Sequence, residues 1–200
     1  MGTRHLTAVI LGDEPRVAQY GQWDGYPSET GVNILKFLEG VNLKAFTEAV
    51  EQTRFEKFGE FDNTVSLEDN PHFSRDMGSE ILGYISDAKD PLVLANNYKF
   101  AADSLFCEWG FIVNLDDKTL ECYRGFVKAQ PHGRFSDMDT DGRNDYRPIH
   151  LLGTYNMDCL PEDEDFVKEV EAWYDESCKL FGEEPVYAEE TQNEQRTTSS

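Results

Sequence analysis

A short segment rich in aromatic residues and glycine carries the highest density of ligand-binding groups in this chain. Residues 19–27 read Gln-Tyr-Gly-Gln-Trp-Asp-Gly-Tyr-Pro, which places three aromatic rings, two amides and a carboxylate close together. Gly21 and Gly25 allow a positive φ or a close approach of the backbone to a partner, and Pro27 stiffens the exit from the segment. Because binding residues concentrate on loops held by a rigid scaffold, we expect a ligand to bind here.

Two kinds of chemistry are expected around this segment. Ligand contacts are expected from the aromatic and polar side chains of Arg4, Tyr20, Gln22, Trp23 and Tyr26. Indole and phenol rings offer stacking surfaces, and an amide side chain both donates and accepts hydrogen bonds. Acid–base catalysis is the second hypothesis, with a hydroxyl, an imidazole and a carboxylate from Thr3, His5 and Asp24. A single histidine on a strand is more often structural, so both interpretations stay open.

Two strands are expected to bring these groups together. Residues 4–11 are rich in β-branched and apolar types, residues 12–15 form a turn cluster, and residues 16–22 return as the second strand. With a four-residue turn, one face of this hairpin collects Thr3, His5 and Thr7 beside Asp24, Gln22 and Tyr20.

The order of Thr3, strand, tight turn, strand and helix resembles the opening of the N-terminal-nucleophile hydrolases. In those enzymes an N-terminal Thr, Ser or Cys attacks an amide, and its own amine acts as the base. The resemblance covers the topology of about forty residues; it implies Thr3 as the nucleophile, amide hydrolysis as the reaction and two sheets between helix layers. Removal of Met1 exposes Gly2, so this role requires a further cleavage.

Three further stretches carry a second resemblance. MGTRHLTAVI, GQWDGYP and DSLFCEWGFIV resemble a set of proteins of about this length from bacteria, phages and fungi, over residues 1–160. That family has no assigned activity. The resemblance therefore implies that the chain forms a folded domain, but it indicates no function.

An aspartate-rich stretch suggests a metal site. Residues 137–145 match the first nine positions of a calcium-binding loop, with Gly142 at position six and carboxylates from Asp137, Asp139, Asp141 and Asp145. Pro148 occupies the position of the bidentate glutamate. The stretch therefore indicates either weak Ca²⁺ binding or an aspartate-rich surface turn, and no other cofactor is expected.

The charge of the chain narrows the range of partners. Its formal net charge is -21, which repels the phosphates of nucleic acids and the headgroups of anionic lipids. Twelve acids against Lys168 and Lys179 make residues 161–190 the most acidic segment. This segment is interpreted as a solvated helix face or as a surface that occupies a basic site on a partner protein.

The cysteines and the hydropathy predict the compartment. The four cysteines form no CxxC pair and no zinc-ligand spacing, which favours reduced, buried thiols. No stretch approaches the ~20 apolar residues of a membrane span, and no secretory signal pattern is present. We therefore expect a cytoplasmic protein that does not bind membranes.

The expected fold is α+β. An antiparallel sheet is built from the first hairpin, a second hairpin at 105–115 and 120–127, and a late strand at 147–156, covered by three or four helices. The variant with two stacked sheets follows from the hydrolase resemblance. Residues 1–187 are expected to form one domain and residues 188–200 a disordered tail.

In the second hairpin, Leu115 is placed opposite Leu120; this register puts Trp109 and Phe111 on one face with Cys122 and sets Gly110 opposite Gly125. Helices are expected after Asn42, from about Ser74, and at the end of the domain up to Gly182.

The sequence supports two function hypotheses. The first is a cytosolic domain that binds a small-molecule or peptide-like ligand at the GQWDGYP segment, with amide hydrolysis as its enzymatic version. The alternative is an acidic interaction or inhibitor protein that binds a basic partner protein, as anti-restriction and anti-defence phage proteins do.

Overall fold

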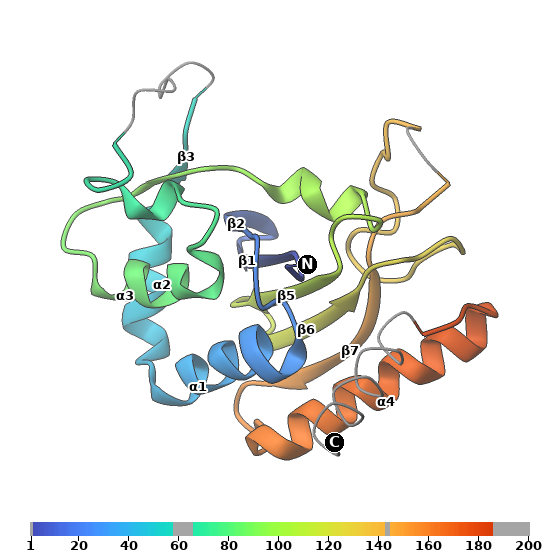
Figure 1. Ribbon diagram of the computed structural model, residues 1–200. Helices are drawn as coiled ribbons and strands as arrows, with labels where there is room; N and C mark the ends of the chain where they lie inside the picture. Colours follow the sequence, from blue (N-terminus) through green and yellow to red (C-terminus); the bar gives the residue numbers. More distant parts are fainter. Residues whose placement is uncertain (1, 58–65, 143–144, 186–200) are drawn as a thin grey trace, which may run out of the picture.

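A five-stranded sheet organises the molecule, in the order β2-β1-β5-β6-β7 (Figure 1). The computed structural model describes residues 2–57, 66–142 and 145–185. The strands are β1 (His5–Leu11), β2 (Glu14–Gly21), β5 (Trp109–Asn114), β6 (Thr119–Arg124) and β7 (His150–Asn156). The α+β class is confirmed, but the sheet is mixed because β1 and β5 run parallel. The long helical connection between β2 and β5 makes this parallel pairing possible.

Helices cover one face of this sheet, and loops cover the other. The helices are α1 (Val32–Gly40), α2 (Leu43–Glu51), α3 (Ile81–Asp87) and α4 (Asp163–Phe181). Their apolar side chains form one core with Val9 and Phe111. The second core joins Leu6 and Ile112 to Phe135 of a long loop. The variant with two stacked sheets is wrong for the described residues, because the second sheet consists only of β3 (Arg54–Phe55) and β4 (Val93–Leu94).

The register of the first hairpin differs by one residue from the predicted one. The turn is shorter, because Leu11 pairs with Glu14 across Gly12 and Asp13, which have φ values of 67° and 59°. Two positive φ values suit a two-residue hairpin turn whose twist matches that of the strands. After a β-bulge the pairs are His5 with Gly21 and Leu6 with Tyr20. Tyr20 therefore lies on the opposite face from His5.

The second hairpin is shifted by two residues, so its predicted faces are correct. Trp109 pairs with Arg124 and Phe111 with Cys122, as expected for side chains on one face. Gly110 lies opposite Tyr123 instead of Gly125. The Ile149 side chain fills the space beside Gly110, where an added Cβ would lie 2.7 Å from Cδ1 of Ile149.

The ends of the helices follow local rules. The Asn42 side chain accepts a hydrogen bond of 3.1 Å from the backbone N–H of Ala45 and so begins α2. α4 ends at Gly182, whose φ is 66°. The expected helix from residue 74 starts later, at Ile81, after a 3-10 turn that begins at Gly78.

Two further expectations from the sequence concern membrane spans and the C-terminal tail. No helix in the described part of the chain combines the length and the apolar character that a membrane span requires. The tail at 188–200 lies outside the described residues.

Candidate functional site

Arg4 occupies the centre of a polar and aromatic surface where β1 begins. Its Nε and Nη2 atoms each donate to Oε1 of Glu108 at 3.2 Å. Its guanidinium carbon lies 4.8 Å from the centre of the Phe106 ring. Because Glu108 and Phe106 precede β5, the parallel pairing of β1 with β5 brings them to Arg4. A carboxylate and an aromatic ring therefore hold the guanidinium in a fixed orientation.

Tyr20 and Gln22 are on the β2 side of Arg4. The Tyr20 hydroxyl donates to Oε1 of Gln22 at 2.6 Å, and its ring meets the Phe100 ring edge-on at 4.9 Å. Partial burial raises the pKa of Tyr20, although the positive charges of Arg4 and Arg75 oppose this shift. The phenol therefore stays protonated at neutral pH and keeps its donor.

Trp23 follows Gln22 and is exposed to solvent. Half of its side chain is exposed, and its indole N–H donates to Oδ1 of Asp76 at 3.0 Å. The indole covers Gly2, where an added Cβ would lie 2.1 Å from the ring. Phe106 is 45% exposed. We call the following six residues the Arg4 surface: Arg4, Tyr20, Gln22, Trp23, Phe106 and Glu108.

Tyr20 thus links two other predicted ligand-binding residues, Arg4 and Gln22, and the exposed Trp23 follows Gln22 in the chain. Tyr26 lies further along, where the chain enters the helical turn before α1. Sequence reasoning missed Phe106 and Glu108. Both lie in the DSLFCEWGFIV stretch, but only the pairing of β5 with β1 places that stretch beside Arg4.

Residues 74–76 hold the 19–27 segment in place through hydrogen bonds. The backbone N–H of Gln22 donates to the carbonyl of Arg75 at 3.0 Å, and the side-chain amide of Gln19 donates to the carbonyl of Ser74 at 3.0 Å. With the bond from Trp23 to Asp76, three hydrogen bonds hold the segment. Preorganisation of this kind reduces the entropy lost when a ligand binds.

The three residues of the catalytic hypothesis are separated by burial. Thr3 is 3% exposed and His5 is 2% exposed, whereas Asp24 lies on the surface with a φ of 55°. The carbonyl of Thr3 accepts a hydrogen bond of 2.9 Å from the N–H of Gly25. A molecule in the solvent therefore reaches Asp24 but is kept from Thr3 and His5. Their catalytic roles stay predictions.

His5 lies in a tight cradle of glycines. A Cβ added at Gly21 would lie 2.1 Å from the imidazole, and one at Gly78 would lie 3.0 Å from Nε2. Neither ring nitrogen has a hydrogen-bond partner of normal geometry among the described residues. Burial lowers the pKa of His5 to about 4, and nearby backbone groups of Thr3 and Trp23 oppose this shift only in part. His5 is therefore neutral at pH 7.

Replacing Gly21 by alanine should destabilise the protein by about 1 to 3 kcal/mol, because the methyl group collides with the imidazole. The same substitution should cost much less when His5 is also alanine, since the nearest atoms to the new Cβ all belong to His5. Urea unfolding of the two single variants and the double variant measures this coupling. If the losses of the two single variants add up in the double variant, the methyl group at position 21 does not collide with His5.

The predicted calcium loop belongs to the connection between β6 and β7. The backbone N–H of Asp141 donates to Oδ1 of Asp139 at 3.0 Å. Among the residues that the structure describes, no three His, Cys, Asp or Glu side chains are grouped as a metal site. Residues 143–144 of the loop lie outside that description. Calcium binding by Asp137, Asp139, Asp141 and Asp145 stays a prediction.

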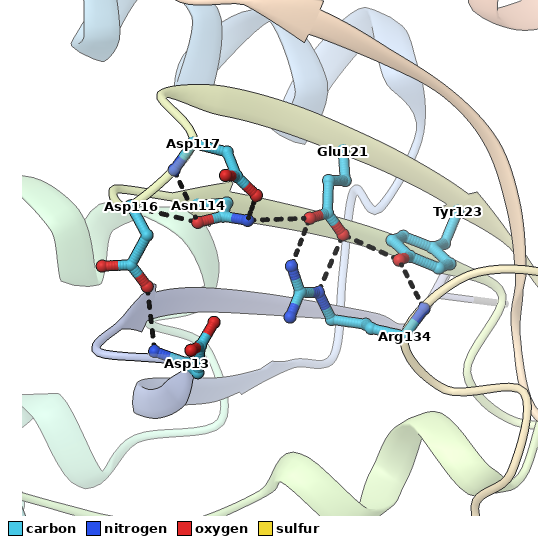
Figure 2. A network of polar contacts seen from close by, with 7 residues as sticks. All are labelled: Asp13, Asn114, Asp116, Asp117, Glu121, Tyr123 and Arg134. Carbon is cyan, nitrogen blue, oxygen red and sulfur yellow. Dashed lines mark hydrogen bonds and ion pairs between the residues drawn. The ribbon is translucent and has the colours of Figure 1, made fainter.

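A partly buried polar network joins strands and turns at the opposite end of the sheet (Figure 2). Glu121 is 7% exposed and accepts hydrogen bonds from the guanidinium of Arg134 and, at 2.7 Å, from the hydroxyl of Tyr123. Asp116 accepts from the backbone N–H of Asp13 at 2.9 Å, which ties together the turns of the two hairpins. Glu121 is buried and paired with Arg134, whereas Asp13, Asp116 and Asp117 are exposed on the hairpin turns. These contacts join strands and turns of the sheet, so we assign the network to the stability of the sheet.

Comparison with known proteins finds no relative. No protein family, curated protein or solved structure matches this chain. The resemblances to N-terminal-nucleophile hydrolases and to the family from bacteria, phages and fungi therefore stay predictions. The function of this protein is therefore inferred from the geometry of the Arg4 surface.

Proposed function

We propose that the protein binds a peptide-like ligand on the Arg4 surface. The observation that supports this function is the guanidinium of Arg4 held by Glu108 and Phe106, two residues along the chain from Gly2, which the half-exposed indole of Trp23 covers. Guanidinium groups donate to carbonyl and carboxylate oxygens, and exposed tryptophan and arginine dominate the binding energy of many interfaces.

The charges of the surface favour a ligand that is mainly uncharged. Glu108 neutralises Arg4, and the chain as a whole carries a net charge of -21. A strongly acidic ligand would be repelled by the remainder of the chain. A peptide segment offers carbonyl oxygens to Arg4, amide partners to Gln22 and apolar side chains to Trp23 and Phe106.

Hydrolysis of the ligand is not part of this proposal. Thr3 and His5 are buried, whereas Asp24 is exposed. Binding requires only the side chains that the fold already brings to the surface.

The experiment that tests this function is selection from a displayed library of unstructured heptapeptides. The dissociation constant of a selected peptide is then measured for the protein and its variants. Trp23→Ala and Arg4→Met should each weaken binding about 30-fold, which corresponds to a loss of about 2 kcal/mol. Leu180→Ala is the control, because Leu180 is an exposed apolar residue on α4. No selected binder, or binders that tolerate Trp23→Ala, would contradict the proposal.

Measuring binding at increasing salt concentration tests the acidic interaction hypothesis. α4 exposes acids along most of its length, including Glu164, Asp165, Glu169, Glu171, Asp175 and Glu176. A basic partner bound to this helix should be released as salt rises from about 0.05 to 0.5 M, because the Debye length then falls below 10 Å. A peptide bound to the Arg4 surface should remain bound, since its contacts are largely uncharged.

A further inference from the structure

The two edges of the five-stranded sheet differ in how they are covered. Along β2, the backbone N–H of Asn97 donates to the carbonyl of Ala18 at 3.0 Å, so another segment shields this edge. On β7, the N–H of Leu151 donates to the carbonyl of His132 at 3.0 Å. Further along β7, at residues 152–155, no described segment forms a hydrogen bond with the outer edge.

The open part of β7 presents backbone hydrogen-bonding groups. The N–H of Met157 donates to the carbonyl of Lys118 at 2.9 Å and so points towards β6. Since these groups alternate along an antiparallel strand, the N–H groups of Thr154 and Asn156 and the carbonyl of Thr154 point away from β6. β7 contains no proline and no Lys, Arg, Asp or Glu, the residues that commonly protect a sheet edge. Such an edge can accept an extended peptide as a further strand.

α4 lies along β7 at this edge (Figure 1). The indole of Trp173 covers Gly153 of β7, where an added Cβ would lie 2.5 Å from the ring. One turn earlier, Oε2 of Glu169 accepts a hydrogen bond of 3.0 Å from the hydroxyl of Tyr155. Glu176 follows Trp173 by three residues, so the helical repeat places it on the same side of α4. We call Glu169, Trp173 and Glu176 the β7 flank of α4.

The lysines of α4 lie on the opposite flank. Glu164 precedes Trp173 by nine residues, or about two and a half turns, which places it on the far side of the helix. Lys168 pairs with Glu164 at 3.5 Å, and Lys179 follows Lys168 by about three turns. Both glutamates of the β7 flank are exposed, and neither forms an ion pair within the described part of the chain. The β7 flank therefore carries uncompensated negative charge.

We propose that an extended, basic segment of a partner protein adds to β7 as a sixth strand. Its backbone binds the outward groups of Thr154 and Asn156, and every second side chain faces α4. Those side chains are about 7 Å apart, whereas Glu169, Trp173 and Glu176 follow one another at about 6 and 4.5 Å along the helix axis. The matching segment therefore carries a basic, an apolar and a basic residue at alternate positions.

A second copy of the chain is a poorer occupant of this edge. Pairing of β7 with β7 would bring two α4 helices together, each with seven acids against Lys168 and Lys179. An acidic segment would meet the same repulsion, and the net charge of -21 favours the approach of basic segments. β7 and β2 are opposite edges of the sheet, so this proposal does not depend on the Arg4 surface.

Three peptides test the proposal by titration into ¹⁵N-labelled protein. The first is acetyl-Thr-Lys-Thr-Val-Thr-Lys-Thr-amide, which should produce saturable amide shifts within residues 151–156 and 169–176. The second has Glu in place of both Lys and should produce none. The third is the lysine peptide with N-methyl groups on Val and the next Thr. It keeps both charges but cannot donate to β7 in either strand direction, so it should bind about tenfold more weakly.

Two double variants separate the β7 flank from the general charge of the helix. Glu169→Gln with Glu176→Gln should weaken binding of the lysine peptide about tenfold. Glu171→Gln with Asp175→Asn is the matched control, because it removes the same charge from exposed positions on the opposite flank. It should weaken binding less than about twofold in physiological salt. Equal losses in the two double variants, equal binding of the N-methylated peptide, or no saturable shifts would overturn the proposal.

Sedimentation velocity of the protein without peptide distinguishes a partner segment from a second copy. The protein should sediment as a monomer at the concentrations of the titration. A dimer that dissociates in Thr154→Pro, which removes an outward N–H from β7, would assign this edge to a second copy and overturn the proposal.

Discussion

Replacing Arg124 by alanine is expected to lower the free energy of unfolding by about 3 to 5 kcal/mol, the usual cost of breaking a buried ion pair. Arg124 is 1% exposed beneath the C-terminal end of α4. Its Nη2 donates to Oε2 of Glu183 at 2.5 Å, and its Nε donates to Oγ of Ser177 at 2.6 Å. The substitution leaves both partners without the guanidinium.

The rings around Arg124 add to this cost. Its guanidinium carbon lies 5.4 Å from the centres of the Tyr174 and Phe181 rings. The other oxygen of Glu183 accepts from the backbone N–H of Lys128 at 3.0 Å. Arg124 thus attaches the end of α4 to β6 and to the loop that follows β6. We expect α4 to loosen from this end in the variant.

Urea unfolding with circular dichroism measures the loss. Lys36→Ala is the control, because Lys36 forms a surface ion pair of 2.9 Å with Asp163 at the other end of α4. That variant should lose less than about 1 kcal/mol. The double variant Arg124→Met with Glu183→Leu should be more stable than Arg124→Ala, since neither charge remains buried alone. A loss in Arg124→Ala as small as that of Lys36→Ala would contradict this role.

Acidification from pH 7 to pH 4 is expected to remove about 3 kcal/mol of stability through His5 alone. Burial lowers the pKa of its imidazole from 6.5 to about 4 in the folded protein. The unfolded chain therefore binds a proton at a higher pH than the folded chain does. The stability from His5 is fully present above pH 6.5 and is lost as the pH falls towards 4.

The measurement is the free energy of unfolding in urea at several pH values for the protein and for His5→Leu. The difference between the two curves should change by about 3 kcal/mol across this window and stay constant above it. His150 adds a loss in the same direction in both proteins, since burial and the charge of Arg124 lower its pKa to about 4. Parallel curves would show that His5 is hydrogen-bonded or hydrated when folded.

Local patterns predicted most of the secondary structure. Asn42 and Gly182 mark a helix start and a helix end that both appear in the structure. The alternation in the second hairpin placed Trp109 and Phe111 on the same face as Cys122, although the register differed by two residues. Caps and alternation depend on neighbours in the chain, so one sequence suffices to predict them.

The composition of the site could also be recognised from the sequence. The first hairpin and the GQWDGYP segment contain Arg4, Tyr20 and Gln22, which interact in the structure, and the exposed Trp23 that follows them. Their separation from His5 could not be foreseen. It depends on whether the turn has two or four residues, and a shift of one residue moves a side chain to the other face of the sheet.

Only the tertiary structure decided the partners of Arg4 and the burial of His5. Glu108 and Phe106 reach Arg4 through the parallel pairing of β1 with β5, two strands separated by nearly a hundred residues. Gly78 approaches His5 from a segment about 70 residues further along the chain. Non-local pairings of this kind follow from how the whole core packs, and no local pattern encodes them.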